Sequence, residues 1–422
     1  MNLTSHFFGI TGSGQLVKEV KMKNMTSKKF FYQWMGCFMI WIGTNPAFAQ
    51  SPTLVTESSL EIFAPQDEHV HGSSLVALPN GDLLAVWFQG SGERTADDVR
   101  LMGSRKAKTS STWSAPFLMA DTPGIPDCNP VIFLNSKQEL TLVWIAVLGN
   151  RWENSILRTR KSKNYLQTGA PIWNWQDNIL LQPGEEFVKE VQNRFNELPE
   201  SNLGWSQYAP SYEKLILEAV EDSKKRSIGW MTRIKPLVIG DKIILPLYSD
   251  GFNFSMMAIS DDSGETWKPS LPLVGKGPIQ PALALRNNGE LVAMLRDSGD
   301  GPTFIQQSIS KDQGKTWTAA IKTSIPNTAS VELLRLADGR WLMIGNDLHD
   351  GRYRLALWTS LDEGLTWSTN PYYLENDKDK KGSFSYPSLI QDSNGTVHIS
   401  YSKHFPTGKT IQYKSINPVK IN

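Results

Sequence analysis

Cysteine is almost absent from this sequence, and so is any net charge. The 422 residues include only Cys37 and Cys128, and the formal charge is +1. A neutral chain lacks the basic excess that binding to nucleic-acid phosphates requires, so we expect no nucleic-acid partner. If Cys37 is removed with a leader segment, the single remaining cysteine excludes an intramolecular disulfide. Stability must then come from the core, in which Cys128 is expected to act as a small apolar residue.

Long uninterrupted hydrophobic runs are also missing. The most apolar stretch, FFYQWMGCFMIWIGTNPAFAQ, is too short and too interrupted for a good membrane span. It follows two lysines and ends in Ala47-Phe48-Ala49, a small-x-small cleavage signature. We therefore expect residues 1–49 to be a leader and signal peptide, with Met25 as an alternative start. Residues 50–422 would form one exported domain, periplasmic or secreted, in a bacterium. A membrane anchor is the alternative.

Tryptophan, by contrast, is abundant, with 15 residues, and three of them close a repeated octapeptide. The pattern Ser-x-Asp-x-Gly-x-Thr-Trp begins at Ser260, Ser310 and Ser360. Asp and Gly in this order predict a tight turn in which the Asp side chain satisfies backbone donors and Gly takes a positive φ. Thr returns the chain to a strand, and Trp docks beneath the turn. We interpret the box as a structural fastening rather than as a catalytic motif.

Pairs of alternating apolar runs occur throughout the chain. PALALRNNGELVAMLRD, for example, turns at Asn288-Gly289, and Asn-Gly or Asp-Gly between such runs predicts a tight, primed β-hairpin turn. Six such units begin near residues 71, 129, 233, 280, 330 and 385. Each continues into one or two further strands. Trp-rich, repeated small sheets of this kind predict an all-β fold, a six-bladed β-propeller.

One segment breaks the pattern between the second and third units. Residues 186–228, approximately, are charged and lack alternation, and their apolar residues recur at helical spacing, as in Tyr212, Leu215, Ile216 and Ala219. We expect a helical insertion between blades 2 and 3 that contributes to a rim over the site.

The hairpin geometry predicts where functional side chains gather. The start of the first strand and the end of the second lie at the same end of a hairpin, opposite its turn, so residues at these positions should share one face. They are His69, His71, Arg94, Asp97, Asp98, Asn129, Asn150, Arg151, Arg233, Lys235, Asp250, Gln280, Arg296, Asp297, Glu332, Asn346, Asp347, Arg352, Tyr386, Lys403 and His404. Arginines suit capture of a carboxylate, and carboxylates beside a Tyr suit acid/base or nucleophilic chemistry on a sugar. Rim salt bridges are the structural alternative.

The three boxes in a six-unit layout resemble the sialidase (neuraminidase) superfamily, in its bacterial BNR or Asp-box repeat branch, over roughly residues 60–415. The segments GWMTRIKPL, LPLYSDGFNFSMMAISDDSGETW, AMLRDSG and YPSLIQDSNGTVHISYS carry the closer likeness. The resemblance implies three arginines that hold a substrate carboxylate, an Asp acid/base, and a Tyr nucleophile assisted by a Glu. Arg296 and Arg352 match two of the arginines, Tyr386 matches the nucleophile, and Asp97 or Asp98 falls near the acid/base position.

The sequence departs from that pattern at two positions. His71 stands where the first arginine is expected, and Gln280 stands where the assisting Glu is expected. Arg233 is a candidate for the third arginine and Glu332 for the missing Glu. His71, Gln280 and Arg94 remain candidates for substrate binding.

Three functions remain open. The leading hypothesis is an exported exo-glycosidase, monomeric and without a cofactor, which cleaves a terminal acidic sugar such as sialic acid from a glycan. The second is a lyase on uronic acid polymers, with His71 and Tyr386 as base and acid. The third is a non-catalytic glycan-binding propeller. A metal site is not expected, because His69 and His71 have no matching third ligand in the sequence.

Overall fold

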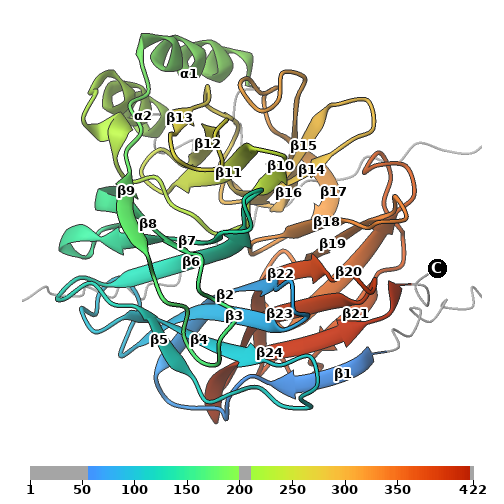
Figure 1. The fold of residues 1–422 in the computed structure, drawn as a ribbon. Helices are drawn as coiled ribbons and strands as arrows, with labels where there is room; N and C mark the ends of the chain where they lie inside the picture. The colour runs from blue at the N-terminus through green and yellow to red at the C-terminus, as the bar shows by residue number, and fades with distance from the viewer. Residues whose placement is uncertain (1–55, 199–210, 419–422) are drawn as a thin grey trace, which may run out of the picture. The chain divides into compact units, whose positions relative to one another are not determined.

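The computed structural model describes residues 56–198 and 211–418. These residues form six four-stranded antiparallel sheets, the blades of a β-propeller (Figure 1), which confirms the predicted fold. The predicted leader peptide and its cleavage site lie outside the described residues. Within the described part of the chain, no helix is both long and apolar enough to span a membrane.

The first three blades follow the chain in order, each from its inner to its outer strand. Blade 1 contains β2 (His69–Ala77), β3 (Leu83–Gly90), β4 (Arg100–Lys106) and β5 (Phe117–Ala120). Blade 2 contains β6 (Asp127–Leu134), β7 (Leu140–Val147), β8 (Ser155–Ser162) and β9 (Trp175–Ile179). Blade 3 contains β10 (Leu237–Ile239), β11 (Lys242–Ser249), β12 (Phe254–Ser260) and β13 (Lys268–Pro269).

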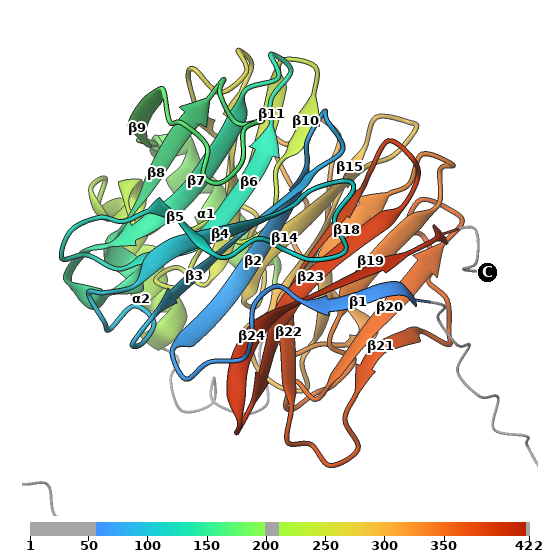
Figure 2. The same cartoon turned by 60° about the horizontal axis from the view of Figure 1, so that its bottom comes forward.

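The last three blades include the closure of the ring. Blade 4 contains β14 (Pro278–Leu285), β15 (Leu291–Asp297), β16 (Phe304–Ser310) and β17 (Ile321–Pro326). Blade 5 contains β18 (Glu332–Arg335), β19 (Trp341–Gly345), β20 (Arg354–Ser360) and β21 (Tyr372–Asn376). Blade 6 contains β22 (Ser383–Gln391), β23 (Val397–Phe405), β24 (Gly408–Ile416) and, from the other end of the chain, β1 (Thr56–Glu61). Because β1 pairs with β24, blade 6 joins both ends of the propeller (Figure 2).

The inner hairpins turn where the sequence predicts, but the turn type differs. In the turns at residues 81, 289, 339 and 395 the glycine has φ between 86° and 91°, and its N–H donates to the carbonyl three residues earlier. The preceding Asn or Asp is not among the residues with positive φ. These are therefore type I turns followed by a left-handed glycine, and not the primed turns that were predicted.

The repeated boxes adopt one hydrogen-bond pattern. In the box of blade 4 the Ser310 hydroxyl donates to Asp312 Oδ1 at 2.8 Å and accepts from Gly314 N at 2.9 Å. Asp312 also accepts from the Thr316 backbone at 2.9 Å and from its hydroxyl at 2.6 Å. The Trp317 ring packs with apolar side chains of blades 3 and 4, and its Nε1 donates to the Gly314 carbonyl at 3.0 Å. The box thus fastens one blade to the next.

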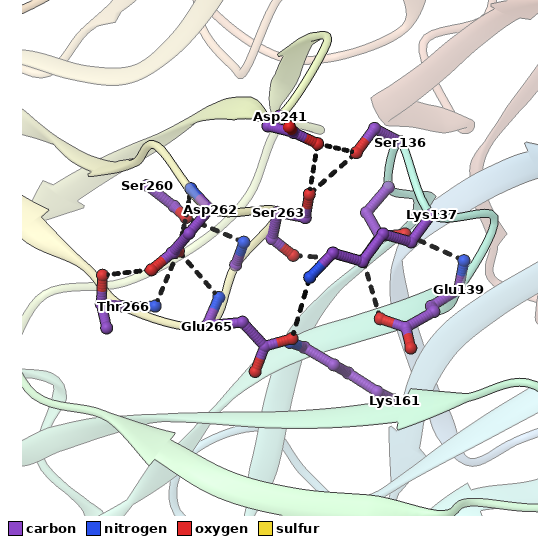
Figure 3. A network of polar contacts seen from close by, with 12 residues as sticks. Ser136, Lys137, Glu139, Lys161, Asp241, Ser260, Asp262, Ser263, Glu265 and Thr266 are labelled. Carbon is purple, nitrogen blue, oxygen red and sulfur yellow. Dashed lines mark hydrogen bonds and ion pairs between the residues drawn. The ribbon is translucent and has the colours of Figure 1, made fainter.

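The blade 3 box also contacts the hairpin turn of blade 2 (Figure 3). Asp241 Oδ1 accepts from the hydroxyls of Ser136 at 2.5 Å and Ser263 at 2.8 Å, and Lys161 pairs with Glu265 at 2.9 Å. Because these contacts involve hairpin turns, they lie at the end of the blades opposite the predicted functional face.

Helices α1 (Glu185–Glu197) and α2 (Ser211–Glu221) lie between β9 and β10, as predicted. Short 3-10 turns also occur at Leu148–Asn150, Trp152–Asn154 and Lys225–Ser227. On α1, Phe187 packs against Trp230 and Phe254, with ring centroids 6.0 and 6.1 Å apart, so the insertion is anchored to blade 3 (Figure 1). No described residue of either helix lines the central cavity, so the expected rim over the site is not formed by them.

Candidate functional site

A polar cavity of about 330 Å³ opens at the end of the hairpins opposite their turns. All six blades contribute to its wall. The lining residues are His69, His71, Glu93, Asn129, Trp152, Tyr248, Asp250, Gln280, Arg296, Arg352, Tyr386 and His404. Of the residues predicted to share one face, the structure brings together here His69, His71, Asn129, Asp250, Gln280, Arg296, Arg352, Tyr386 and His404.

Left-handed bulges aim several of these side chains inward. The pairing register shifts in the inner strands of blades 1, 2, 4 and 6. At these bulges φ is 64° for Gly72, 50° for Asn129, 55° for Gln280 and 57° for Tyr386. Each non-glycine residue in this conformation costs about 1–3 kcal/mol, and such strain is concentrated at functional sites. All three non-glycine residues line the cavity.

Tyr386 occupies the centre of the site. Its Oη accepts hydrogen bonds from Gln280 Nε2 at 3.3 Å and from Arg296 Nη1 at 3.4 Å. The His71 ring stacks on the phenol ring, with centroids 4.0 Å apart and planes 26° apart. The Arg352 Cζ lies 5.5 Å from the centroid of the same ring. The phenol oxygen is therefore surrounded by hydrogen-bond donors and cations.

The charges of Arg296 and Arg352 are balanced only at a distance, by Glu93 and, for Arg296, also by Asp250. Among the described residues neither forms an ion pair, although most other arginines near carboxylates do. Arg296 Nε is buried without a hydrogen-bond partner, and the Arg352 guanidinium reaches the Ser385 hydroxyl, at 3.4 Å, and Tyr386. Burial lowers the pKa of Arg352, Tyr386 opposes that effect, and Arg296 lowers it further. Two guanidinium groups held together in this way form a binding site for an anion.

Two carboxyl groups, Glu93 and Asp250, face the same cavity. Desolvation raises the pKa of both side chains, although Arg94 and Arg352 oppose the effect at Glu93 and Arg296 opposes it at Asp250. Asp250 raises the pKa of Glu93 further, because like charges disfavour a second ionisation. Asp250 keeps an exposed surface at the mouth, yet the surrounding protein still desolvates its carboxylate. A carboxyl group with a raised pKa is suited to donate a proton near neutral pH.

Three imidazole rings form one wall of the cavity. His69, His71 and His404 have ring centroids 5.4–5.8 Å apart. Burial lowers the pKa of His69 to about 4 and that of His71 well below its ordinary value, and it also lowers the pKa of His404. His71 Nδ1 lies 2.7 Å from the Ser402 hydroxyl. These rings are neutral at pH 7, so His71 does not replace the charge of an arginine.

Arg233 and Glu332 lie beneath the cavity and do not line it. Arg233 is 2% exposed, and its guanidinium donates to the carbonyls of Ser73 at 3.3 Å and Pro387 at 3.0 Å. Glu332 is also 2% exposed and pairs with Lys235 at 2.8 Å. A direct contact of either side chain with substrate is therefore not supported by this geometry.

The carboxylates predicted near the acid/base position lie outside the cavity as well. Asp97 is exposed and accepts from Asn150 Nδ2 at 3.0 Å. Asp98 is exposed and accepts from the Ser91 hydroxyl at 2.8 Å, and this bond lowers the pKa of Asp98. Both positions belong to a loop whose direction the hairpin rule does not determine. Arg94, in the same loop, lies behind the wall, with its Cζ 5.5 Å from the Trp152 ring.

Glu93, Trp152 and Tyr248 were not predicted from the sequence. Glu93 adjoins a predicted residue, Arg94, and Tyr248 lies two positions before Asp250, on the same side of a strand. Tyr248 accepts from Asn129 Nδ2 at 3.2 Å, and burial raises its pKa well above the ordinary value, so it stays protonated. The three non-glycine bulge residues, Asn129, Gln280 and Tyr386, each precede a proline, and this recurrent pair is a sequence feature that marks the bulges.

No group of three or more His, Cys, Asp or Glu side chains within the described ranges is arranged to hold a metal ion. His69, His71 and His404 are likewise not joined by further ligands into such a group. Cys128 is buried and free, and burial raises its pKa well above the ordinary value. The polar chemistry of this site is therefore that of Tyr, Arg, carboxyl and imidazole groups.

Solved structures with the same fold include both glycosidases and a protein of unknown function. The latter, from Dyadobacter fermentans, has a TM-score of 0.64 at 17% identity, over 87% of this chain and 99% of that one. The leech intramolecular trans-sialidase has a TM-score of 0.60 at 13% identity, over 86% and 70% of the two chains. The Penicillium chrysogenum α-L-arabinanase has a TM-score of 0.55 at 14% identity, over 88% and 100%. At these identities the likeness shows the fold alone.

The sequence itself has no significant match among curated proteins. The family model described as a BNR repeat-like domain matches residues 81–399, which is most of the chain. The chain therefore belongs to the BNR repeat-like domain family, with a sialidase-like six-bladed propeller.

Proposed function

We propose that this protein is a glycoside hydrolase that removes a terminal acidic sugar, sialic acid or a related one, from glycans. The observation that carries the proposal is the pair of guanidinium groups, Arg296 and Arg352, that contact Tyr386 and form no direct ion pair among the described residues. An anionic substrate group would supply a direct counterion to them. The cavity holds about 330 Å³, which suits a terminal sugar rather than the middle of a polymer.

In the proposed first step, Tyr386 Oη, as the phenolate, attacks the anomeric carbon. The bond from that carbon to the glycosidic oxygen breaks, and Glu93 or Asp250 gives its proton to the leaving oxygen. In the second step the resulting carboxylate takes a proton from water, the water attacks the same carbon, and the phenolate is released. This assignment replaces Asp97 and Asp98 by carboxyl groups that line the cavity.

The test is turnover of sialyl and other acidic glycosides by the wild-type protein and by Tyr386→Phe. We expect the wild type to release the terminal acidic sugar and the variant to lose at least about 100-fold in kcat, because nucleophilic catalysis contributes several kcal/mol. Arg354→Met, in β20 of the adjacent blade 5, is the matched control and should retain activity. Unchanged turnover in Tyr386→Phe would refute the assigned nucleophile.

One observation favours a second function, a lyase on uronic acid polymers. His71 is neutral and stacks directly on Tyr386, so a base and an acid lie side by side next to two arginines. In a lyase one group would remove the proton next to the uronate carboxyl, and the other would protonate the leaving oxygen. Products with unsaturated ends, detected by their absorbance, distinguish this reaction from hydrolysis. Binding of acidic glycans without any turnover would indicate a glycan-binding module.

We further propose export of the chain, with residues 1–49 as leader and residues 50–422 as a single monomeric domain without a cofactor. The small-x-small motif at Ala47–Ala49 supports this proposal. Mass measurement of the N-terminus of the protein recovered from the periplasm or medium tests it, with Gln50 as the expected first residue.

A further inference from the structure

A buried cation lies directly beneath the proposed nucleophile. The Arg233 Cζ is 4.7 Å from the centroid of the Tyr386 ring. Its guanidinium donates to the Pro387 carbonyl, next to Tyr386 in β22, and to the Ser73 carbonyl in β2. Arg233 therefore connects the two bulged inner strands that present Tyr386 and His71.

The charge of Arg233 is only partly balanced. Glu332, the nearest described carboxylate to interact with it, forms its ion pair with Lys235 instead, at 2.8 Å. Burial lowers the pKa of Arg233, whereas Tyr386 and Glu332 raise it, and an arginine stays charged even so. The layer below the phenol thus holds two cations and one carboxylate, an excess of one positive charge.

The charged groups that face Tyr386 are all cations. No carboxylate takes the place of the assisting Glu, because Gln280 stands there. The facing groups are Arg233 from below, Arg296 and Arg352 at the sides, and the neutral His71 and Tyr248.

We propose that Arg233 is a positioning residue that fixes the Tyr386 bulge and stabilises the phenolate of Tyr386 from beneath its ring. The inference rests on the proposed role of Tyr386 as the nucleophile. A buried guanidinium then takes the place of a carboxylate base. The phenol loses its proton to water before the reaction, and Arg233 stabilises the resulting phenolate, which is the form that attacks.

The test compares Arg233→Met with Arg233→Lys. A unit charge 4.7 Å from the ring centroid shifts the titration of the ring's hydroxyl by roughly two to three pH units at an effective dielectric constant of about 20. In Arg233→Met the acidic limb of the pH profile of kcat/KM, on which activity rises with pH, should shift to higher pH by that amount. Arg233→Lys keeps the charge and should stay near the wild type. Arg286→Met, a buried arginine that bonds to Glu290 and the Glu363 carbonyl, is the matched control with an unmoved limb.

Two further measurements keep the outcome clear if Arg233→Met does not fold or if no substrate is turned over. Glu332→Gln removes the negative charge near Arg233 and should move the limb down. Ultraviolet difference titration of the phenols, with Tyr386→Phe as the reference, follows Tyr386 without any substrate. Absence of turnover would refute the proposed function alone. A Tyr386 titration that is the same in wild type and in the Arg233 and Glu332 variants would overturn the role of Arg233.

Discussion

Arg352→Met tests whether the unpaired guanidinium groups bind substrate. Arg352 has no ion pair to lose among the described residues, and its side chain contacts the protein through a long bond to Ser385, at 3.4 Å, and through Tyr386. A hydrogen bond to a charged group contributes about 1.5–3 kcal/mol, and 1.4 kcal/mol corresponds to a factor of ten. Loss of Arg352 should therefore lower kcat/KM on an acidic glycoside by about 10- to 150-fold.

The stability of Arg352→Met should stay the same or rise, although its activity falls. Burial and the neighbouring Arg296 lower the pKa of Arg352, so the folded protein disfavours its charge. Methionine has a similar length and no charge, and we expect the thermal midpoint of Arg352→Met to equal or exceed that of the wild type. Loss of activity without loss of stability is typical of a residue kept for function.

The wild type and Arg352→Met are each assayed on two substrates, the acidic glycoside and its carboxyl-reduced analogue. If Arg352 binds the carboxylate, its substitution should cost little on the neutral analogue, as in a double-mutant cycle. Arg354→Met is the control, because Arg354 pairs with Asp347 at 3.0 Å and neither residue lines the cavity. An equal loss on both substrates would refute carboxylate recognition by Arg352.

Three further predictions concern the proton donor, a bulge and a box. The raised pKa of Glu93 means that the folded chain holds a proton that the unfolded chain releases, so stability falls as pH rises from the ordinary pKa to the raised one. Glu93→Gln should therefore raise the thermal midpoint at pH 7, measured by calorimetry, while kcat falls; a lower midpoint would contradict this. Gly72→Ala should destabilise by about 1–3 kcal/mol in urea melts, because φ is +64° and the new Cβ would lie 2.8 Å from Phe88 Cε1. Asp312→Ala breaks a half-buried turn network and should lower stability by about 1 kcal/mol with kcat/KM unchanged; altered kcat/KM would show that the box affects the site.

The fold was predictable because each blade carries its own local signals. Asn288-Gly289 and its equivalents located the turns, and the three boxes located the blade ends, so the register of the inner strands followed. That register placed His71, Gln280, Arg296, Arg352 and Tyr386 at one end of the hairpins, which is where the structure brings them together.

Side-chain direction was not predictable in the same way. Arg233 and Glu332 occupy the correct end of their blades but lie beneath the cavity, because the inner strands of blades 3 and 5 lack the bulge found in blades 1, 2, 4 and 6. Glu93 was overlooked in favour of Asp97 and Asp98 because all three belong to one loop, whose conformation depends on contacts with blade 2, such as that from Asn150.

The most direct test of the central claim is mass spectrometry of the enzyme after reaction with a fluorinated acidic glycoside that accumulates a covalent intermediate. The account predicts one added sugar on the peptide that contains Tyr386 and no adduct in Tyr386→Phe. Turnover of the parent glycoside with the adduct on another residue, or with an unsaturated product and no adduct, would contradict it.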